Sequence, residues 1–497
     1  MMNRSKTPRF RFSRPLPWLR GLILLAGSLL FVLLSAPMVA AATSRHYTGL
    51  EFPPLRAVEM PNYERYTMPN GIVVYLMENH ELPLVSGQAS FRTGSRLEPL
   101  AQVGLASLTG TVLRSGGTVE RTPDEINQFL EQRAAAVETS IGDASGSASF
   151  ESLTADLPDV LNLFAEILQK PAFRADQIDL AKQQLGGAIA RRNDDPDDIA
   201  SREFSKRIYG PDHPYARTVE YQTLANIERE DLIQFYQQSF RPEQMLLGIV
   251  GDFEPRQMKA LLAEAFGDWQ PAAAPPLPSL PTVEPATLGG TFFIEQPQLT
   301  QSYIYLGHLG GQLSDPDYAA LSLMNGVLNG FGGRFFNELR SRQGLAYSVY
   351  GYWSPRFDYP GLFIAGGQTR SEATVPFIES LRREIDRIRT TPITPAELDY
   401  AKESILNSFV FNFQSPGQTL SRLMRYEYYG YPADFIFSYQ REIQTTTAAD
   451  ILQAAAKYLK PEQLTTLVVG NSGAIDPPLA NLGSEVAALD ISIPPAQ

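Results

Sequence analysis

Residues 104–118 read Gly-Leu-Ala-Ser-Leu-Thr-Gly-Thr-Val-Leu-Arg-Ser-Gly-Gly-Thr, and this stretch, taken as a helix, decides how the chain is interpreted. Gly94-Ser95-Arg96-Leu97-Glu98 precedes it. Ser107 and Thr111 are four residues apart and therefore lie on one face of this helix, and Gly110 lies between them in the sequence. Zinc prefers imidazole, thiolate or carboxylate ligands, and these three residues supply none of them.

The pattern resembles the zinc-site helix of pitrilysin/insulinase-type metallopeptidases. In that family the helix carries an inverted zinc motif, H-x-x-E-H, between a G-S-R-x-E segment and a G-T pair. The resemblance places the two histidines at Ser107 and Thr111 and the catalytic glutamate at Gly110. It therefore implies a chain that keeps the peptidase scaffold and has lost its metal chemistry.

The third zinc ligand of the family is a glutamate further along the chain, and its spacing from Thr111 places it at Ala188. The chain has no cysteine and four histidines, none of which is spaced i,i+4 from another: His46, His80, His213 and His308. No helix face therefore offers two imidazoles together. We expect no metal cofactor in this chain. A lone histidine in the 212–215 segment, His213, is expected to be structural.

Length and composition limit the number of domains and the kinds of partner that the chain can have. A chain of 497 residues is too long for one typical core and predicts two or more domains. Hydrophobic residues make up 43%, so sizeable cores can form. The net charge of −12 argues against a nucleic-acid partner, which needs a basic surface.

The N-terminus reads as a targeting segment over residues 1–42. Basic residues precede the apolar run 22–34, and small residues at 36–42 suit cleavage. Export to the periplasm or cell envelope follows as the expectation. An uncleaved membrane anchor is the alternative, although the run is short for a membrane span and ends at Pro37.

The chain repeats itself at an offset near 220. Asp179-Leu180-Ala181-Lys182 matches Asp399-Tyr400-Ala401-Lys402, and Tyr209-Gly210 matches Tyr429-Gly430. Beyond a one-residue slip, Val250-Gly251 matches Val469-Gly470. Several matches in order at one offset indicate a duplication. This period is far longer than that of a solenoid repeat, so two large homologous domains are predicted.

The predicted domains are α+β in class. Residues 72–76 and 84–91 read as strands, whereas apolar stripes in 157–168 and 377–388 read as core-facing helices. The N-terminal domain is expected over 50–270, a proline-rich linker over 271–286, the C-terminal domain over 287–476 and a loose tail over 477–497. The family resemblance implies that both domains share one fold and face each other across a cleft.

The C-terminal half carries the best-preserved motif, residues 333–349. It is similar to a family signature in which an arginine and a tyrosine seven residues apart contact the substrate backbone. Here they are Arg340 and Tyr347. A guanidinium and a phenol are suited to hold a peptide carbonyl that becomes an oxyanion. The alternative is a structural arginine paired with a carboxylate such as Glu338, beside a tyrosine that lines a loop.

Some members of the family are heterodimers in which one subunit binds zinc and the other supplies the arginine–tyrosine pair. The resemblance thus predicts a zinc-less subunit of an exported heterodimeric peptidase, inactive alone. Its partners would be a homologous subunit carrying H-x-x-E-H and a peptide substrate. Two alternatives stay open: a stand-alone peptide-binding or scaffold protein, and an autonomous metallopeptidase with atypical ligands.

Overall fold

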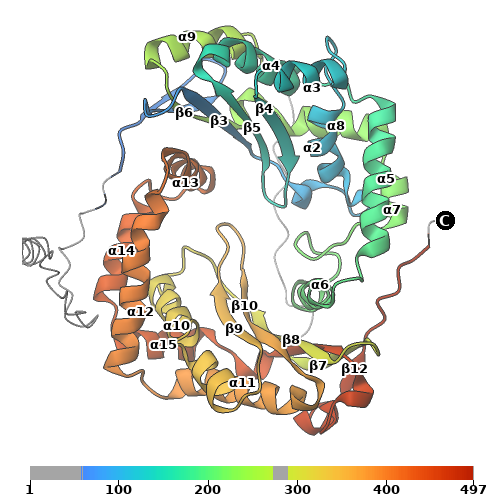
Figure 1. Ribbon diagram of the computed structural model, residues 1–497, viewed down its shortest axis with the longest axis vertical. Coiled ribbons are helices and arrows are strands. Elements are labelled where there is room, and N and C mark those ends of the chain that lie inside the picture. The colour runs from blue at the N-terminus through green and yellow to red at the C-terminus, as the bar shows by residue number, and fades with distance from the viewer. Residues whose placement is uncertain (1–57, 59, 272–288, 496–497) are drawn as a thin grey trace, which may run out of the picture. The chain divides into compact units, whose positions relative to one another are not determined.

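Two six-stranded sheets with packed helices make up the described part of the chain, residues 58, 60–271 and 289–495 of a computed structural model (Figure 1). The first sheet contains β1 (Glu64–Thr67), β2 (Val73–Glu78), β3 (Leu84–Phe91), β4 (Ala136–Ile141), β5 (Gly146–Leu153) and β6 (Met245–Gly251). The helices of this N-terminal half are α2 (Leu105–Ser115), α3 (Pro123–Glu131), α4 (Leu157–Gln169), α5 (Ala175–Arg191), α6 (Pro196–Tyr209), α7 (Tyr221–Ala225), α8 (Arg229–Ser239) and α9 (Pro255–Phe266).

The second sheet contains β7 (Gly290–Glu295), β8 (Gln301–Leu309), β9 (Ser348–Ser354), β10 (Leu362–Arg370), β11 (Thr465–Gly470) and β12 (Val486–Ala488). The helices of this C-terminal half are α10 (Tyr318–Leu328), α11 (Thr374–Thr390), α12 (Pro395–Ser408), α13 (Pro416–Tyr429), α14 (Phe435–Thr445) and α15 (Ala448–Tyr458). Strands and helices are therefore mixed within each half, which confirms the α+β prediction.

The two sheets repeat one topology. Their strand orders are β1-β2-β6-β3-β5-β4 and β12-β7-β11-β8-β10-β9. In each sheet a parallel pair, β2–β6 or β7–β11, is followed by antiparallel neighbours. Helix α6 corresponds to α13 at an offset of 220 (416 − 196), and β6 ends 219 residues before β11 (470 − 251). The predicted duplication is confirmed.

Local sequence signals account for several element boundaries. Thr122 accepts a hydrogen bond from the Glu125 amide and Glu125 bonds back, which forms a capping box in front of Pro123, the first residue of α3. The apolar stripe predicted in 157–168 is the buried face of α4, and that predicted in 377–388 is the buried face of α11. These helices cover the outer face of their own sheets, and each half has its main core there.

A helix from the other half covers part of the inner face of each sheet (Figure 1). Helix α6 packs on β8 and β11, where Phe204 and Ile208 meet Tyr305 and Leu467 in one buried cluster. Helix α13 packs in the same way on β2 and β6, where Leu420 and Met424 are buried. Because neither sheet buries its second face without the other half, the two halves depend on each other for a complete core.

Helix α13 approaches the first sheet closely because β6 has a glycine there. A Cβ built on Gly248 would lie 2.4 Å from the Met424 sulfur and 2.9 Å from a terminal carbon of Leu420. A side chain at 248 would force the side chains of Met424 and Leu420 to shift. This contact between elements from different halves therefore favours a small residue at one position.

Polar contacts reinforce the junction between the halves. Arg65 and Tyr75 both hydrogen-bond to the carboxylate of Glu427, at the end of α13. Arg96 forms an ion pair with Asp358, in the loop between β9 and β10. The side chains of Arg65 and Tyr75 hold the pKa of Glu427 below its usual value, chiefly by hydrogen bonding from Arg65.

The C-terminal residues differ from the expected loose tail. Residues 486–488 form β12, which pairs in parallel with β7, and the amide of Leu489 donates to the Phe293 carbonyl at 2.8 Å. Leu479 is buried, and Ile491 packs against the cluster beneath α6. The tail therefore supplies the sixth strand, which the N-terminal half takes instead from residues before β2. Proline content was a poor guide because the prolines, at 477–478 and 494–495, flank the strand and do not interrupt it.

Two sequence predictions lie outside the described residues: the targeting segment 1–42 and, apart from Pro271, the linker 271–286. Within the described part of the chain, every helix is too short or too polar to cross a membrane.

Cutting the chain between the halves is expected to leave them associated, because α6 and α13 each bury apolar side chains in the opposite half. A specific protease site placed within 272–288 tests this. After cleavage both fragments should elute together in size-exclusion chromatography. As a comparison, the double variant Phe204→Ala and Met424→Ala should dissociate more readily, since each truncation costs about 2–5 kcal/mol. If the fragments without substitutions eluted separately, the packing of α6 and α13 on the opposite half could not be the main contact between the halves.

Candidate functional site

The G-S-R-x-E segment positions helix α2 rather than a ligand. The Glu98 carboxylate accepts hydrogen bonds from the amides of Gly104 and Ala106, at 3.2 and 2.9 Å, where α2 begins. Glu98 is buried, and burial raises its pKa although these amides lower it. Carboxylates are stabilised at a helix N-terminus by unpaired N–H groups. Gly104 itself has φ 109°, a conformation that favours glycine.

The degenerate ligand positions lie on neighbouring helices. Ser107 is half-buried and Thr111 is exposed, both on α2, whereas Ala188 is exposed on α5, which packs against α2. None of the three offers a group that binds zinc. In the described residues there is no cluster of three histidine, aspartate or glutamate side chains able to hold a metal ion.

Gly110, the position that the family resemblance assigns to the catalytic glutamate, is closed by backbone. A Cβ built on Gly110 would lie 2.4 Å from the Ile141 amide nitrogen and 2.8 Å from the Ser140 carbonyl carbon, both in β4. The Thr139 hydroxyl donates to the Gly110 carbonyl at 2.6 Å, which ties the helix to the same strand. A side chain at 110 therefore requires α2 and β4 to move apart. The loss at this position is thus a change in packing as well as in residue type.

Each described histidine makes local structural contacts. His80 contacts Asp252, His213 stacks on Tyr209 and bonds to the Tyr359 hydroxyl, and His308 contacts the Leu309 carbonyl. Burial, followed by the charges of Arg217 and Arg356, lowers the pKa of His213 to about 4. His213 therefore joins the two halves as a neutral side chain, in agreement with its expected structural role. His46 lies outside the described residues.

The structure brings Arg340 and Tyr347 together on the C-terminal half. Residues Phe336–Arg342 form a π-helical turn, a conformation found often at functional sites. The Arg340 guanidinium lies 5.8 Å from the Tyr347 ring centre and 5.1 Å from that of Phe336. Tyr347 is 71% exposed, and Arg340 is also exposed. Both polar ends are therefore accessible to a peptide.

Glu338, the carboxylate considered as a structural partner for Arg340, bonds elsewhere. It forms an ion pair with Arg342 and accepts from the Gln343 side chain at 2.9 Å. Among the residues with described positions, Arg340 has no ion pair. Its contacts are the two aromatic rings, which orient the guanidinium plane without satisfying its five N–H donors.

Sequence reasoning missed the residue that anchors this turn, Arg334. It is buried and its Nε and Nη2 atoms donate to the two carboxylate oxygens of Glu397, at 2.6 and 3.1 Å. Glu397 in turn caps the start of α12 with Thr394. These contacts lower the pKa of Glu397 to about 2, with the Arg334 hydrogen bond as the largest cause. In the sequence, Arg334 follows two glycines, and nothing in this pattern indicated that Arg334 would be buried and paired while Arg340 would be exposed.

Comparisons with known proteins agree with this geometry. A family profile described as "Insulinase (Peptidase family M16)" matches residues 73–220, and one described as "Peptidase M16 inactive domain" matches residues 226–405. The chain belongs to the insulinase (M16) family, as a homologue that lacks the zinc ligands.

Related sequences include the "Non-peptidase homolog YmxG" of Helicobacter pylori, 24% identical over 406 residues, which span 80% of this chain and 92% of that protein. The "Uncharacterized zinc protease Rv2782c" of Mycobacterium tuberculosis is 26% identical over 337 residues, 65% of this chain and 74% of that protein. A peptidase M16 inactive domain from Pseudomonas fluorescens has a TM-score of 0.74 and 28% identity, and is matched over its whole length by 84% of this chain.

The periplasmic protease PqqL from Escherichia coli has the same fold, with a TM-score of 0.69 and 15% identity. The match spans 86% of this chain and 48% of that one.

Gly110→Ala is expected to destabilise the protein by about 1–3 kcal/mol, the range for overpacking a filled site. The added methyl would meet the β4 backbone, which cannot rotate away as a side chain can. Denaturant unfolding measures the change. Thr111→Ala, one residue further on and exposed, should stay within about 0.5 kcal/mol of the parent. Equal stability of both variants would mean that α2 and β4 are further apart than described.

Arg334→Ala is expected to lower the free energy of unfolding at pH 7 by about 2 kcal/mol. This is below the range for breaking a buried pair because Glu397 is partly exposed.

The Arg334–Glu397 pair also predicts a pH dependence. Because the folded pKa of Glu397, about 2, lies below its usual value of 4.5, its contribution is present above pH 4.5 and is lost as the pH falls toward 2. The stability difference between parent and variant should therefore shrink over this window. A constant difference between pH 7 and pH 3 would contradict the ion pair.

Proposed function

We propose that this chain is the zinc-less subunit of an exported heterodimeric peptidase of the insulinase family. It would supply Arg340 and Tyr347 to a zinc-bearing partner with H-x-x-E-H. The observation that carries the proposal is the contrast between two regions of one chain. The Arg340–Tyr347 pair is exposed, adjacent and held by a buried anchor, whereas the catalytic position at Gly110 is blocked by β4.

Export rests on the basic and apolar segment in residues 1–42. PqqL of Escherichia coli, a protein of the same fold, is a periplasmic protease, which agrees with an envelope location for this chain. Neither the degenerate positions Ser107, Thr111 and Ala188 nor the base position Gly110 would contribute to catalysis. Zinc would be held by the partner alone.

In the complex, a peptide carbonyl would lie between the zinc of the partner and the Arg340–Tyr347 pair. The guanidinium fork would donate to the substrate backbone, and the Tyr347 hydroxyl would donate to the carbonyl oxygen as negative charge develops on it. The Phe336 ring beneath Arg340 would keep the guanidinium in one orientation, which lowers the entropy lost on binding.

A stand-alone peptide-binding role is the second candidate, and a specific observation favours it. Recesses lined by both halves already exist within this single chain, between Gln88 and Ser147 of the first sheet and Ser421 of α13. Peptide binding by the isolated protein, with no homologous subunit recovered from the cell envelope, would support this alternative.

The leading proposal is tested by mixing the purified chain with a zinc-bearing homologue from the cell envelope of the same organism and measuring peptide cleavage. Arg340→Ala or Tyr347→Phe should lower peptide turnover by about 10²–10³, the usual loss of one oxyanion donor. The melting temperature and the assembly should stay nearly unchanged, because both side chains are exposed. Arg340→Lys should also be poor, since a single ammonium does not reproduce the planar fork.

Arg342→Ala provides the matched control: it removes the same charge from the same turn, but from a residue paired with Glu338. It should leave turnover within a few-fold of the parent. Unchanged turnover in the Arg340 and Tyr347 variants would make the pair structural. Loss of assembly instead would place the motif in the subunit interface.

A further inference from the structure

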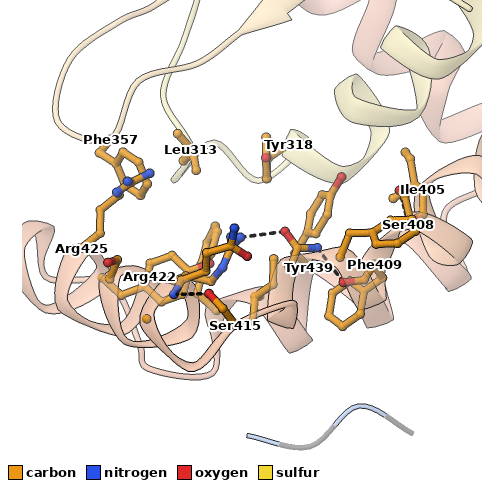
Figure 2. A pocket seen from close by; sticks show the side chains of 18 residues that line it. Leu313, Tyr318, Phe357, Ile405, Ser408, Phe409, Ser415, Arg422, Arg425 and Tyr439 are labelled. Atoms are coloured by element: carbon orange, nitrogen blue, oxygen red, sulfur yellow. Dashed lines mark hydrogen bonds between the residues drawn. The ribbon is translucent and has the colours of Figure 1, made fainter. Parts of the chain in front are cut away.

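A large recess in the C-terminal half lies outside the Arg340–Tyr347 region. It has a volume of about 840 Å³ and lies between the end of α12, the first three turns of α13, helix α14 and the loop that carries Phe357 (Figure 2). This volume is within the range of about 300–1,000 Å³ that is usual for sites of small ligands. The recess shares no lining residue with the 333–349 segment that carries Arg340 and Tyr347.

The recess is positively charged in an acidic protein. Arg422 and Arg425 line it, one turn apart on α13, and none of its 18 lining residues is acidic. Neither arginine forms an ion pair with a carboxylate in the described part of the chain. By contrast, the chain as a whole has a net charge of −12. Two cations without a counter-charge in one recess favour an anionic ligand.

The guanidinium of Arg422 is held by a hydrogen bond to a side chain, which leaves other N–H groups for a ligand. Its Nη2 atom donates to the Asn412 side-chain oxygen at 2.7 Å, and Asn412 is held by the Phe409 carbonyl at 2.9 Å. These contacts fix the direction of the guanidinium (Figure 2). Its Nε atom is buried without a hydrogen-bond partner among the described residues. A guanidinium held in one direction is suited to a carboxylate, which can accept two of its N–H groups side by side.

The walls of the recess are aromatic. Tyr318, Phe409, Phe435 and Tyr439 line its inner side, and Phe357 lies across from Arg425, whose guanidinium carbon is 6.0 Å from the Phe357 ring centre. Aromatic walls of this kind bury a planar or branched apolar group and hold it in specific geometry. The recess therefore combines a binding site for an anion with a binding site for an apolar side chain.

The recess continues into a polar groove between the halves. Phe357, Ser421 and Arg425 also line a second hollow of about 360 Å³, whose other residues include Gln88, Ser90 and Ser147 on the first sheet. The Ser421 hydroxyl bonds to the Gln88 side chain at this passage. Short polar side chains offer donors and acceptors to a peptide backbone, and they present little apolar surface to an acyl chain.

We propose that this recess binds the carboxy-terminal end of a peptide. The free α-carboxylate would pair with Arg422 and Arg425, and the last side chain, aromatic or branched, would occupy the aromatic walls. The preceding residues would run along the serine-rich face of the first sheet. This site goes beyond the proposed function, because it belongs to this chain alone and requires no zinc-bearing partner.

Fluorescence anisotropy with the purified full-length chain tests the inference. The probe is a fluorescein-labelled hexapeptide that ends in phenylalanine with a free carboxylate, and its amidated form is the comparison. The free acid should bind about tenfold to a hundredfold more tightly than the amide, because hydrogen bonds to a charged group are lost on amidation. A peptide that ends in glycine should bind about tenfold more weakly than the phenylalanine peptide.

Variants of the two arginines assign the contact. Arg422→Gln and Arg425→Gln should each weaken binding of the free acid by about tenfold or more, and should leave binding of the amide unchanged. Arg256→Gln is the matched control, because it removes the same charge from an exposed position on α9 and should change neither affinity. If a glutamine variant does not fold, Arg422→Lys keeps the charge and should show an intermediate loss.

Three outcomes would overturn the proposal: equal affinity for acid and amide, full affinity in both arginine variants, or no peptide binding at millimolar concentration. Laurate serves as the second probe. Arginine-dependent binding of laurate without binding of the peptide acid would assign the recess to a fatty acid and would also overturn the proposal. None of these results affects the turnover test of Arg340 and Tyr347, so the two failures are distinguishable.

Discussion

Helices α6 and α13 each cover the inner sheet face of the opposite half, and the rest of the structure depends on this exchange. A mixed sheet with helices on only one face would expose the apolar side of β8 and β11, or of β2 and β6, to water. The exchange is also why one repeat is not a complete domain: each half lacks the helix that completes its own second core. Gly248 leaves room for the Met424 side chain at one of these contacts.

The polar junction follows from the same arrangement. Because α13 ends against the first sheet, its last turn places Glu427 beside Arg65 and Tyr75, and Tyr428 beside the Phe91 and Ala144 carbonyls. The β9–β10 loop then meets Arg96 and His213 from the other half. Between these contacts the serine-rich face of the first sheet stays uncovered, which leaves the groove that continues from the α13 recess. The junction is thus closed at its ends by these contacts, and a polar hollow remains between them.

Packing closes the position that the family resemblance assigns to a catalytic glutamate. Gly110 lies directly against the backbone of β4, whereas Thr111 and Ala188 are exposed. Close packing of this kind makes return of a glutamate at 110 costly, since backbone atoms cannot repack locally. In the C-terminal half, the buried Arg334–Glu397 pair anchors the turn that carries the exposed Arg340. Gly110 is thus enclosed by the N-terminal half, whereas Arg340 is exposed on the C-terminal half.

The sequence by itself determined the class of the fold and the duplication. These depend on periodicity, spacing and residue type, which are local properties. It did not determine the exchange of α6 and α13, because an apolar stripe such as that of Leu420 and Met424 carries no mark of which sheet it will cover. The β12 strand, the anchoring role of Arg334 and the recess around Arg422 and Arg425 were decided by tertiary structure for the same reason. Each joins residues far apart in the chain, and only the folded backbone sets their distance.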